Sequence, residues 1–128
     1  MEETGLSGLL LINKEPGWTS NDVVQKLKGM LKARKVGHTG TLDPMARGVL
    51  PVCIGKATKL AGRFQNTDKE YVCACLLGAA TDTEDASGEI IRTADPERLR
   101  ILTEKEAEEA ALSFVGDYDQ VPPMYSAK

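Results

Sequence analysis

The residues best suited to chemistry lie in one stretch, GHTGTLDPMARGVL, which runs from Gly37 to Leu50. It contains the only histidine of the chain, His38, together with Asp43 and three glycines. An aspartate before proline is held in extended geometry, and most such aspartates only form turns, while few have a catalytic role. Glycines let a ligand approach the backbone closely. These residue types indicate a candidate binding loop that carries a carboxylate.

Several other chemistries fit this sequence poorly. No Gly-Lys-Ser/Thr ends the stretch, as a P-loop requires, and no serine near His38 could complete a triad. One histidine beside one aspartate is a weak metal site. The acidic segment 81–88 has Ser87 where a calcium loop needs glycine. The odd set of three cysteines (Cys53, Cys73 and Cys75) sits in apolar runs, which predicts buried thiols rather than disulfides or zinc ligands.

The composition fits a soluble globular chain of one domain, with 41% hydrophobic and 27% charged residues in 128. No apolar run reaches membrane-spanning length, and the opening MEETGLSG does not resemble a secretory signal. We therefore expect a cytoplasmic protein that does not enter a membrane.

The charge of the chain is unevenly distributed. Residues 1–70 contain 11 Lys/Arg and 7 Asp/Glu, a net charge of +4, whereas residues 71–128 contain 5 and 12, a net charge of −7. A polyanion would prefer the first half of the chain. The alternative, two solvated surfaces of opposite charge, stays open at this point.

Hydrophobic periodicity and capping signals predict an alternation of strands and helices. We expect strands at 8–13, 49–54, 69–77 and 89–92, helices at about 19–33, 56–64 and 103–114, and a loop at 37–50. Pro51 predicts an edge, a bulge or the start of its strand. This alternation indicates an α/β or α+β class.

The sequence resembles the TruB-type tRNA pseudouridine synthases in ordered motifs that span nearly the whole chain. These are GLLLINKEPGWTS (8–20), GHTGTLDPMARGVLPVCIGKATK (37–59), KEY (69–71) with LGAATDTEDASG (77–88), and QVPPMYSAK (120–128). The acidic loop at 81–88 is more similar to the bacterial branch than to relatives that use guide RNAs. The resemblance implies an α+β fold with a mixed, mainly antiparallel sheet and flanking helices.

The resemblance also implies that residues 1–128 form the N-terminal part of a longer catalytic domain. The remainder of that domain, with the arginine that pairs with the catalytic aspartate, and any C-terminal RNA-binding domain are then expected to be absent here. We expect this part alone to be inactive, marginally stable and prone to self-association.

The implied activity is isomerisation of the uridine at tRNA position 55, in the T-loop, to pseudouridine. The resemblance implies no cofactor and no metal. It implies the T-arm stem-loop of tRNA as the partner, with no membrane and no obligate protein partner.

By the same resemblance, Asp43 is the nucleophile, and attack at the ribose C1′ or at the uracil C6 both stay open. Tyr71 would pack against the flipped base and take part in the C5 proton transfer, His38 would assist base flipping, and Asp85 would lie near the site. The remaining substrate-binding residues implied by the motifs are Lys14, Gly40, Thr41, Arg47, Lys56 and Lys59.

Two other functions remain open from the sequence. One is an RNA-binding or RNA-folding module without chemistry, and the other is a guide-dependent enzyme that acts on other RNA. Without the resemblance, Tyr71 could equally cover a core, His38 could bond a backbone carbonyl, and Asp85 could simply form a turn.

Overall fold

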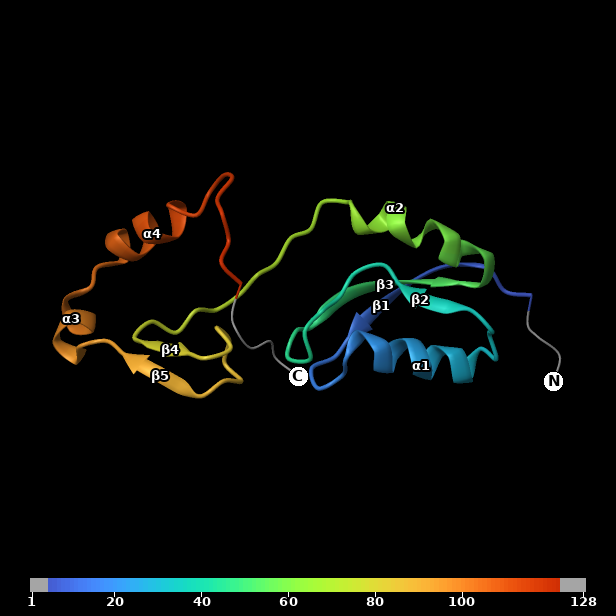
Figure 1. Ribbon diagram of the computed structural model, residues 1–128, viewed down its shortest axis with the longest axis horizontal. Helices are drawn as coiled ribbons and strands as arrows, with labels where there is room; N and C mark the ends of the chain where they lie inside the picture. The colour runs from blue at the N-terminus through green and yellow to red at the C-terminus, as the bar shows by residue number, and fades with distance from the viewer. Residues whose placement is uncertain (1–4, 123–128) are drawn as a thin grey trace. The chain divides into compact units, whose positions relative to one another are not determined.

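A computed structural model describes residues 5–122 and divides the chain into two compact units, Met1–Tyr71 and Val72–Lys128 (Figure 1). The last residues of the fourth motif, 123–128, lie outside the described part. None of the helices in residues 5–122 combines the length and the apolar character that crossing a membrane requires.

The first unit contains a three-stranded antiparallel sheet in the order β1, β3, β2. Strands β1 (Gly8–Lys14) and β3 (Gly48–Ile54) confirm the two strands predicted there to within one residue. Strand β2 (Val36–His38) falls partly inside the stretch predicted as loop, so only residues 39–47 form the loop itself. Every strand pair among the described residues is antiparallel, and the α+β class is confirmed.

Helix α1 (Ser20–Met30) begins at a capping box. The Thr19 hydroxyl accepts a hydrogen bond from the Asp22 backbone N–H, and the Asp22 carboxylate accepts one from the Thr19 N–H. The helix ends before the predicted residue 33, because Lys32 adopts a left-handed conformation with φ of 47°.

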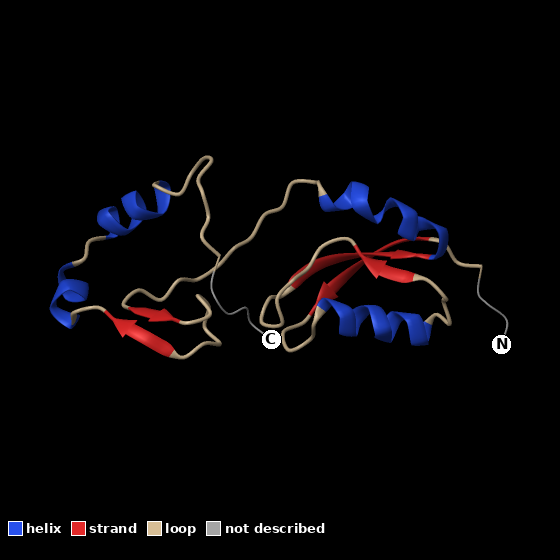
Figure 2. Ribbon diagram, viewed as in Figure 1, coloured by secondary structure: helices blue, strands red, loops and turns tan. Residues whose placement is uncertain are grey.

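The core lies between α1 and one face of the sheet (Figure 2). Val23 and Val24 of α1 pack with Leu50 and Val52, which alternate along β3 and therefore share a face. Partly buried side chains around this cluster are Ile12, Leu27, Val36 and Leu42.

A 3-10 helix, η1 (Gly55–Leu60), and a short helix α2 (Ala61–Gln65) lie on the opposite side of the sheet, as Figure 2 shows. They leave Leu11 and Val49 on that face 67% and 65% exposed. A single α-helix was predicted over 56–64. A 3-10 helix has three residues per turn, so Lys56 and Lys59 still point to the same side. Cys53 is fully buried, as predicted.

Pro51 lies in the middle of the central strand, so the prediction of an edge, a bulge or a strand start is wrong. The ladder between β2 and β3 ends at the pair His38–Val52, so it does not extend to Pro51, the neighbour of Val52 in β3. The Pro51 carbonyl accepts a hydrogen bond from the Thr39 N–H at 3.0 Å, so the missing Pro51 N–H faces the loop rather than β1. Proline therefore costs no bond of the β1–β3 ladder at this position.

The second unit consists of a hairpin and two short helices. Strands β4 (Ala79–Thr81) and β5 (Ile90–Thr93) pair with a bulge, and β5 confirms the predicted return strand. Helix α4 (Glu104–Leu112) begins at the predicted capping box. Helix α3 (Pro96–Ile101) was not predicted, although Asp95 at its N-cap and proline at its first position are ordinary start signals.

The strand predicted at 69–77 does not form, because none of the described residues pairs with it. A strand needs a neighbour for its backbone groups, and an apolar alternation alone does not supply one. Val72 and Leu76 are accordingly 95% and 89% exposed. Cys73 and Cys75 are exposed as well, so the prediction that all three cysteines are buried is wrong for these two.

Candidate active site

Asp43 begins a tight turn in the 39–47 loop. Its carbonyl accepts a hydrogen bond from the Ala46 N–H at 2.9 Å, which places Pro44 second in the turn, where its fixed φ is favourable. The Asp43 side chain is exposed and makes no hydrogen bond or ion pair with any residue in the described range 5–122. The local geometry thus presents a carboxylate that the fold does not use.

Lys14, at the end of β1, holds this turn through hydrogen bonds from its buried ammonium group. Its side chain is 1% exposed, and its ammonium donates to the carbonyls of Trp18 at 2.7 Å, Glu15 at 3.2 Å and Pro44 at 3.3 Å. An ammonium has three N–H donors, so all of them are used. Lys14 therefore connects the β1–α1 turn to the carbonyl of Pro44, the residue after Asp43.

Gly17 and Ser20 hold the same loop on either side of Asp43. The Gly17 N–H donates to the Pro44 carbonyl at 2.7 Å, and Gly17 has φ of 85°, which glycine adopts without strain. The buried Ser20 hydroxyl donates to the Leu42 carbonyl at 3.1 Å and accepts from the Leu42 N–H at 2.9 Å. The backbone on both sides of Asp43, at Leu42 and at Pro44, is thereby anchored to the first residue of α1 and to the turn that precedes it.

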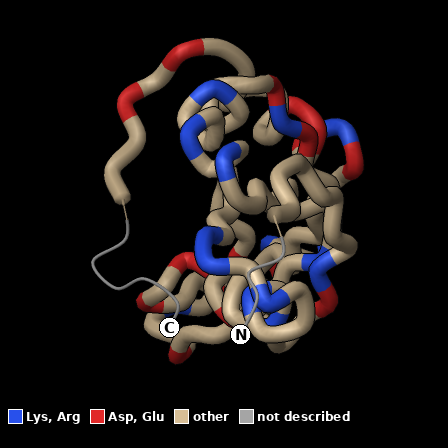
Figure 3. The backbone as a smooth tube through the Cα atoms, turned by 90° about the vertical axis from the view of Figure 1, so that its right-hand side faces the viewer, with Lys and Arg blue, Asp and Glu red and all other residues tan. Residues whose placement is uncertain are grey.

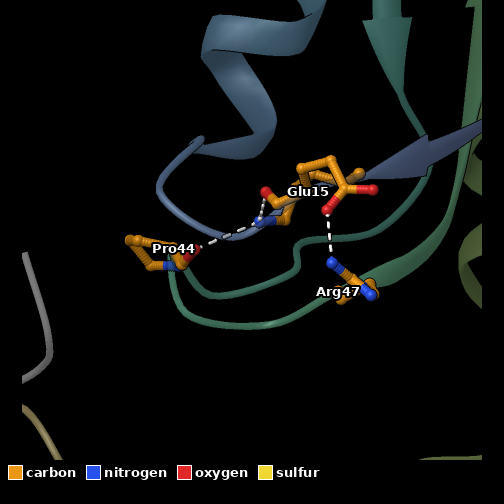
Figure 4. A network of polar contacts seen from close by, with 4 residues as sticks. Glu15, Pro44 and Arg47 are labelled. Carbon is orange, nitrogen blue, oxygen red and sulfur yellow. Dashed lines mark hydrogen bonds and ion pairs between the residues drawn. The ribbon is translucent and has the colours of Figure 1, made fainter.

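Arg47 closes the loop through an ion pair with Glu15 at 2.7 Å (Figure 4). The two side chains are 66% and 53% exposed, so water screens the pair and its contribution to stability is small. The Arg47 guanidinium is thus paired with Glu15 and not with Asp43.

His38 precedes the loop as the last residue of β2, opposite Val52. Its ring is half-buried, and its Nδ1 is buried with no hydrogen-bond partner among the described residues. The simpler interpretation of a loop histidine expected a hydrogen bond to a backbone carbonyl, and Nδ1 forms none with the described residues. The next residue, Thr39, is buried and is bonded to Pro51 through both its N–H and its hydroxyl.

Gly40 and Thr41 lie in the same loop between Thr39 and Leu42. Gly40 is half-buried with open space where a side chain would be, and Thr41 is exposed. The structure therefore places Lys14, Gly40, Thr41, Asp43 and Arg47 in or beside the 39–47 loop, near the start of β3. His38 borders the same loop further along the sheet, opposite Val52.

Tyr71 and Asp85 come from other segments of the chain than the 39–47 loop. Tyr71 is the last residue of the first unit, outside any helix or strand, and its side chain is 65% exposed. Asp85 belongs to the second unit, in the turn between β4 and β5.

The Asp85 carboxylate closes that turn. Its Oδ1 accepts hydrogen bonds from the Ser87 hydroxyl at 2.5 Å, the Thr83 hydroxyl at 2.7 Å and the Ser87 N–H at 2.8 Å. These donors, Ser87 first and Thr83 second, lower the pKa of the Asp85 carboxyl below its ordinary value of 3.8. In this geometry Asp85 orders a turn.

Lys56 and Lys59 lie at the other end of the sheet, in η1, and both are exposed. Strand β3 joins the two ends, and its six residue steps at about 3.3 Å each span roughly 20 Å. The sequence motif therefore contains cations that the fold separates from Asp43.

The sequence did not predict that Ser20 and Gly17 hold the loop around Asp43 through hydrogen bonds. Ser20 was considered only as a helix cap, and its partner Leu42 is 22 residues away. No local pattern predicts such a pair.

Among residues 5–122 no three His, Cys, Asp or Glu side chains are arranged to hold a metal ion.

Residues 28–128 match the model of the TruB family pseudouridylate synthases, in its N-terminal domain. The chain is 53% identical to a tRNA pseudouridine synthase B of Francisella philomiragia over 124 residues, and 51% identical to one of Clostridium kluyveri over 122 residues. Each alignment covers 95% of this chain, but only 40% and 41% of the relative, so the chain spans about two fifths of their length. By these matches, the chain belongs to the TruB family and corresponds to its N-terminal part.

Proposed function

We propose that this chain supplies the nucleophile-bearing part of an enzyme that converts the T-loop uridine at tRNA position 55 to pseudouridine. In this reaction the N-glycosidic bond between N1 and the ribose C1′ breaks, the uracil turns, and a bond forms between C5 and C1′. The C5 proton is released, and N1 takes up a proton. The observation that carries the proposal is the Asp43 turn, which is fastened on both sides while its carboxylate stays exposed and unused.

A carboxylate nucleophile gains from being held in one place before the substrate arrives. Orientation alone can contribute several powers of ten to a rate. The bonds from Ser20 to Leu42 and from Gly17 to Pro44 fix the backbone on both sides of Asp43 without occupying its oxygens. We assign Asp43 the attack on either C1′ or C6 of the target nucleotide.

The target base has to leave the T-loop stack before Asp43 can reach it. We assign His38 to this step, since it borders the loop and its Nδ1 forms no hydrogen bond to a described residue. We assign Tyr71 to stacking on the extruded base, because its ring is exposed and a base can stack on any aromatic face.

No described cation pairs with Asp43, and Arg47 is engaged by Glu15. An opposite charge is a main stabiliser of an ionised carboxylate in a closed site. We therefore propose that residues 1–128 on their own turn over slowly or not at all. We also propose that an arginine from a further segment would complete the site. The reaction is proposed to need no cofactor, guide RNA or partner protein, and to take place in the cytoplasm.

The test uses a chimera of the Francisella philomiragia relative in which the matching segment is replaced by this chain. Tritium release from tRNA with C5-labelled uridine measures the conversion, with no guide RNA or partner protein added. Asp43→Asn is expected to reduce the rate by at least about 10³-fold while tRNA binding stays within about twofold. Asp68→Asn removes the same charge from an exposed position and is the matched control.

Two outcomes contradict the proposal. If the Asp43→Asn chimera converts uridine at the parent rate, the nucleophile is wrongly assigned. If the parent chimera binds tRNA but releases no tritium, the chain is better described as an RNA-binding module or as a guide-dependent relative.

A further inference from the structure

We propose that Cys73 and Cys75 form a redox site, at which a small-molecule disulfide such as oxidised glutathione converts the two thiols reversibly into an intramolecular disulfide. The site begins two residues after Tyr71, at the start of the second unit. Formation of the disulfide is independent of the proposed function. Its effect on activity rests on that function, because Tyr71 is assigned there to the extruded base.

The two thiols project from the same side of the segment 71–77. The exposed fraction alternates along this segment, because Val72 and Leu76 are 95% and 89% exposed, whereas Tyr71 and Leu77 are 65% and 54% exposed. A period of two is typical of extended backbone, in which residues two positions apart point the same way. The cysteines occupy the two odd positions between Tyr71 and Leu77, so both lie on the side of Tyr71.

The two thiols also lie close enough to interact. A hydrogen bond with the Cys73 side chain, and then repulsion from its ionised form, raise the pKa of the Cys75 thiol above its ordinary value of 9.0. Cys75 therefore keeps its proton while Cys73 is charged. This order suits a two-step exchange, because one thiolate attacks the oxidant and a second thiol beside it then resolves the mixed disulfide.

An oxidant in solution reaches these two thiols and not the third. Cys73 and Cys75 are exposed, whereas Cys53 is fully buried, and burial raises the pKa of its thiol and keeps it protonated. Residues 71–81 contain no Lys, Arg, Asp or Glu, and Figure 3 accordingly draws that stretch of the backbone in tan. Side chains of this stretch therefore do not repel an anionic oxidant such as oxidised glutathione.

The reaction consists of two thiol–disulfide exchanges. The Cys73 thiolate attacks one sulfur of oxidised glutathione, which forms a mixed disulfide and releases one glutathione thiolate. The Cys75 thiol then loses its proton to solvent and attacks the Cys73 sulfur, which releases the second glutathione thiolate. The chain thereby loses two protons and two electrons, and oxidised glutathione takes up both electrons to become two molecules of reduced glutathione.

The disulfide and an extended strand exclude one another. Two residue steps of a strand span about 6.6 Å, near the upper end of the range of about 4.4–6.8 Å that disulfides bridge between Cα atoms. Closing the bond draws the two Cα atoms together and bends the backbone between them, so the oxidised segment cannot pair as the strand predicted at 69–77. The bend lies two residues from Tyr71 and displaces its ring. Strained disulfides of this kind are readily reduced, which makes the change reversible.

The first test incubates the 128-residue chain with oxidised glutathione and measures its intact mass. We expect a mass lower by two hydrogen atoms with no glutathione retained, and excess reduced glutathione should restore the starting mass. Cys73→Ser and Cys75→Ser each leave one exposed thiol and should retain one glutathione. The double variant Ala74→Cys, Cys75→Ser is the matched control, because it keeps two exposed thiols but places them on opposite sides of the backbone. Its internal disulfide should form at least about tenfold less.

Three results of this test would overturn the inference. One is a parent chain that retains glutathione on both exposed cysteines and forms no internal bond. Another is a product made only of disulfide-linked dimers, because the thiols would then react between chains. The third is equal disulfide formation in the matched control, because the bond would then reflect a freely moving segment and not two thiols on one side of it.

Activity of the chimera separates this inference from the proposed function. Oxidised glutathione should reduce uridine conversion by at least about tenfold, because Tyr71 is displaced, and dithiothreitol should restore it. The Cys75→Ser chimera should keep its rate in both conditions. If the reduced chimera converts no uridine, the proposed function fails, and the mass measurement alone decides the disulfide. If the disulfide forms in the chimera and conversion is unchanged, the control of activity by this site is contradicted and the isomerase assignment stands.

Discussion

Each of the two units contains a helix that begins at a threonine capping box, but among the described residues only the first unit buries side chains in a core. Helix α1 and helix α4 both begin at a threonine capping box, at Thr19 and Thr103. In the first unit α1 then packs on a sheet, and Leu50 and Val52 are 1% and 0% exposed. In the described part of the second unit, residues 72–122, no side chain is buried.

This difference shows that capping and turn chemistry form elements, whereas a core requires a third strand or a packed helix. Isolated two-stranded hairpins are marginal in water for this reason. The Asp43 loop belongs to the unit with the core, and its anchors Lys14 and Ser20 are themselves buried. The Asp43 loop is therefore attached to the unit whose packing can hold it in place.

The largest expected effect contrasts the two units by one substitution in each. Leu50→Ala removes a fully buried side chain from the first unit and should lower the free energy of unfolding by about 2–5 kcal/mol. Leu76→Ala changes a side chain that is 89% exposed and should alter it by less than about 0.5 kcal/mol. Urea denaturation of both variants measures this, and equal losses would contradict the contrast.

A smaller effect is expected at the buried lysine. Lys14→Met keeps the apolar stem, leaves the Trp18 carbonyl without its Lys14 donor and leaves the Pro44 carbonyl with only the Gly17 N–H, which should cost about 1–3 kcal/mol. Removal of a buried charge offsets part of this cost. Lys105→Met, on an exposed helix surface, is the control and should be neutral. Denaturation curves that coincide for Lys14→Met and the parent would show that the lysine does not fasten the loop.

The smallest expected effect is the pH dependence of the turn that contains Asp85. Hydrogen bonds from Ser87 and Thr83 lower its folded pKa below 3.8, so the stabilisation is complete above that value and is lost as pH falls through the lower, folded pKa. A carboxyl titration followed by NMR should give a midpoint for Asp85 below 3.8, and Ser87→Ala should raise it. A midpoint that Ser87→Ala leaves unchanged would contradict this account of the turn.

Much of the fold could be predicted wherever local chemistry and burial agree. The strand at 8–13 and the capping box at Thr103 were predicted because apolar runs and N-cap residues act through near neighbours. The strand predicted at 69–77 has the same apolar alternation, but none of the described residues pairs with it. Periodicity reports which face would be buried and does not report whether a partner is present.

Part of the candidate site could likewise be predicted from the sequence, and part could not. The resemblance identified the loop that carries Asp43, and its turn follows from the Asp-Pro pair. The anchoring of that loop could not be predicted, because Lys14 and Pro44 are 30 residues apart and meet only through the sheet. Lys14 was expected to contact RNA from its motif, and the structure instead surrounds its ammonium with backbone carbonyls. Burial of a charged group depends on tertiary contacts that the sequence pattern does not encode.

The central claim is that the first unit holds the backbone around Asp43 rigidly, and amide hydrogen exchange measures this directly. The Leu42 N–H is bonded to Ser20 and the Gly17 N–H to Pro44, so both should exchange as slowly as amides of β3. In Ser20→Ala the Leu42 amide should lose its protection, while β3 keeps its own. If the Leu42 and Gly17 amides of the parent chain exchange as fast as those of residues 72–76, the loop is not held and the account is contradicted.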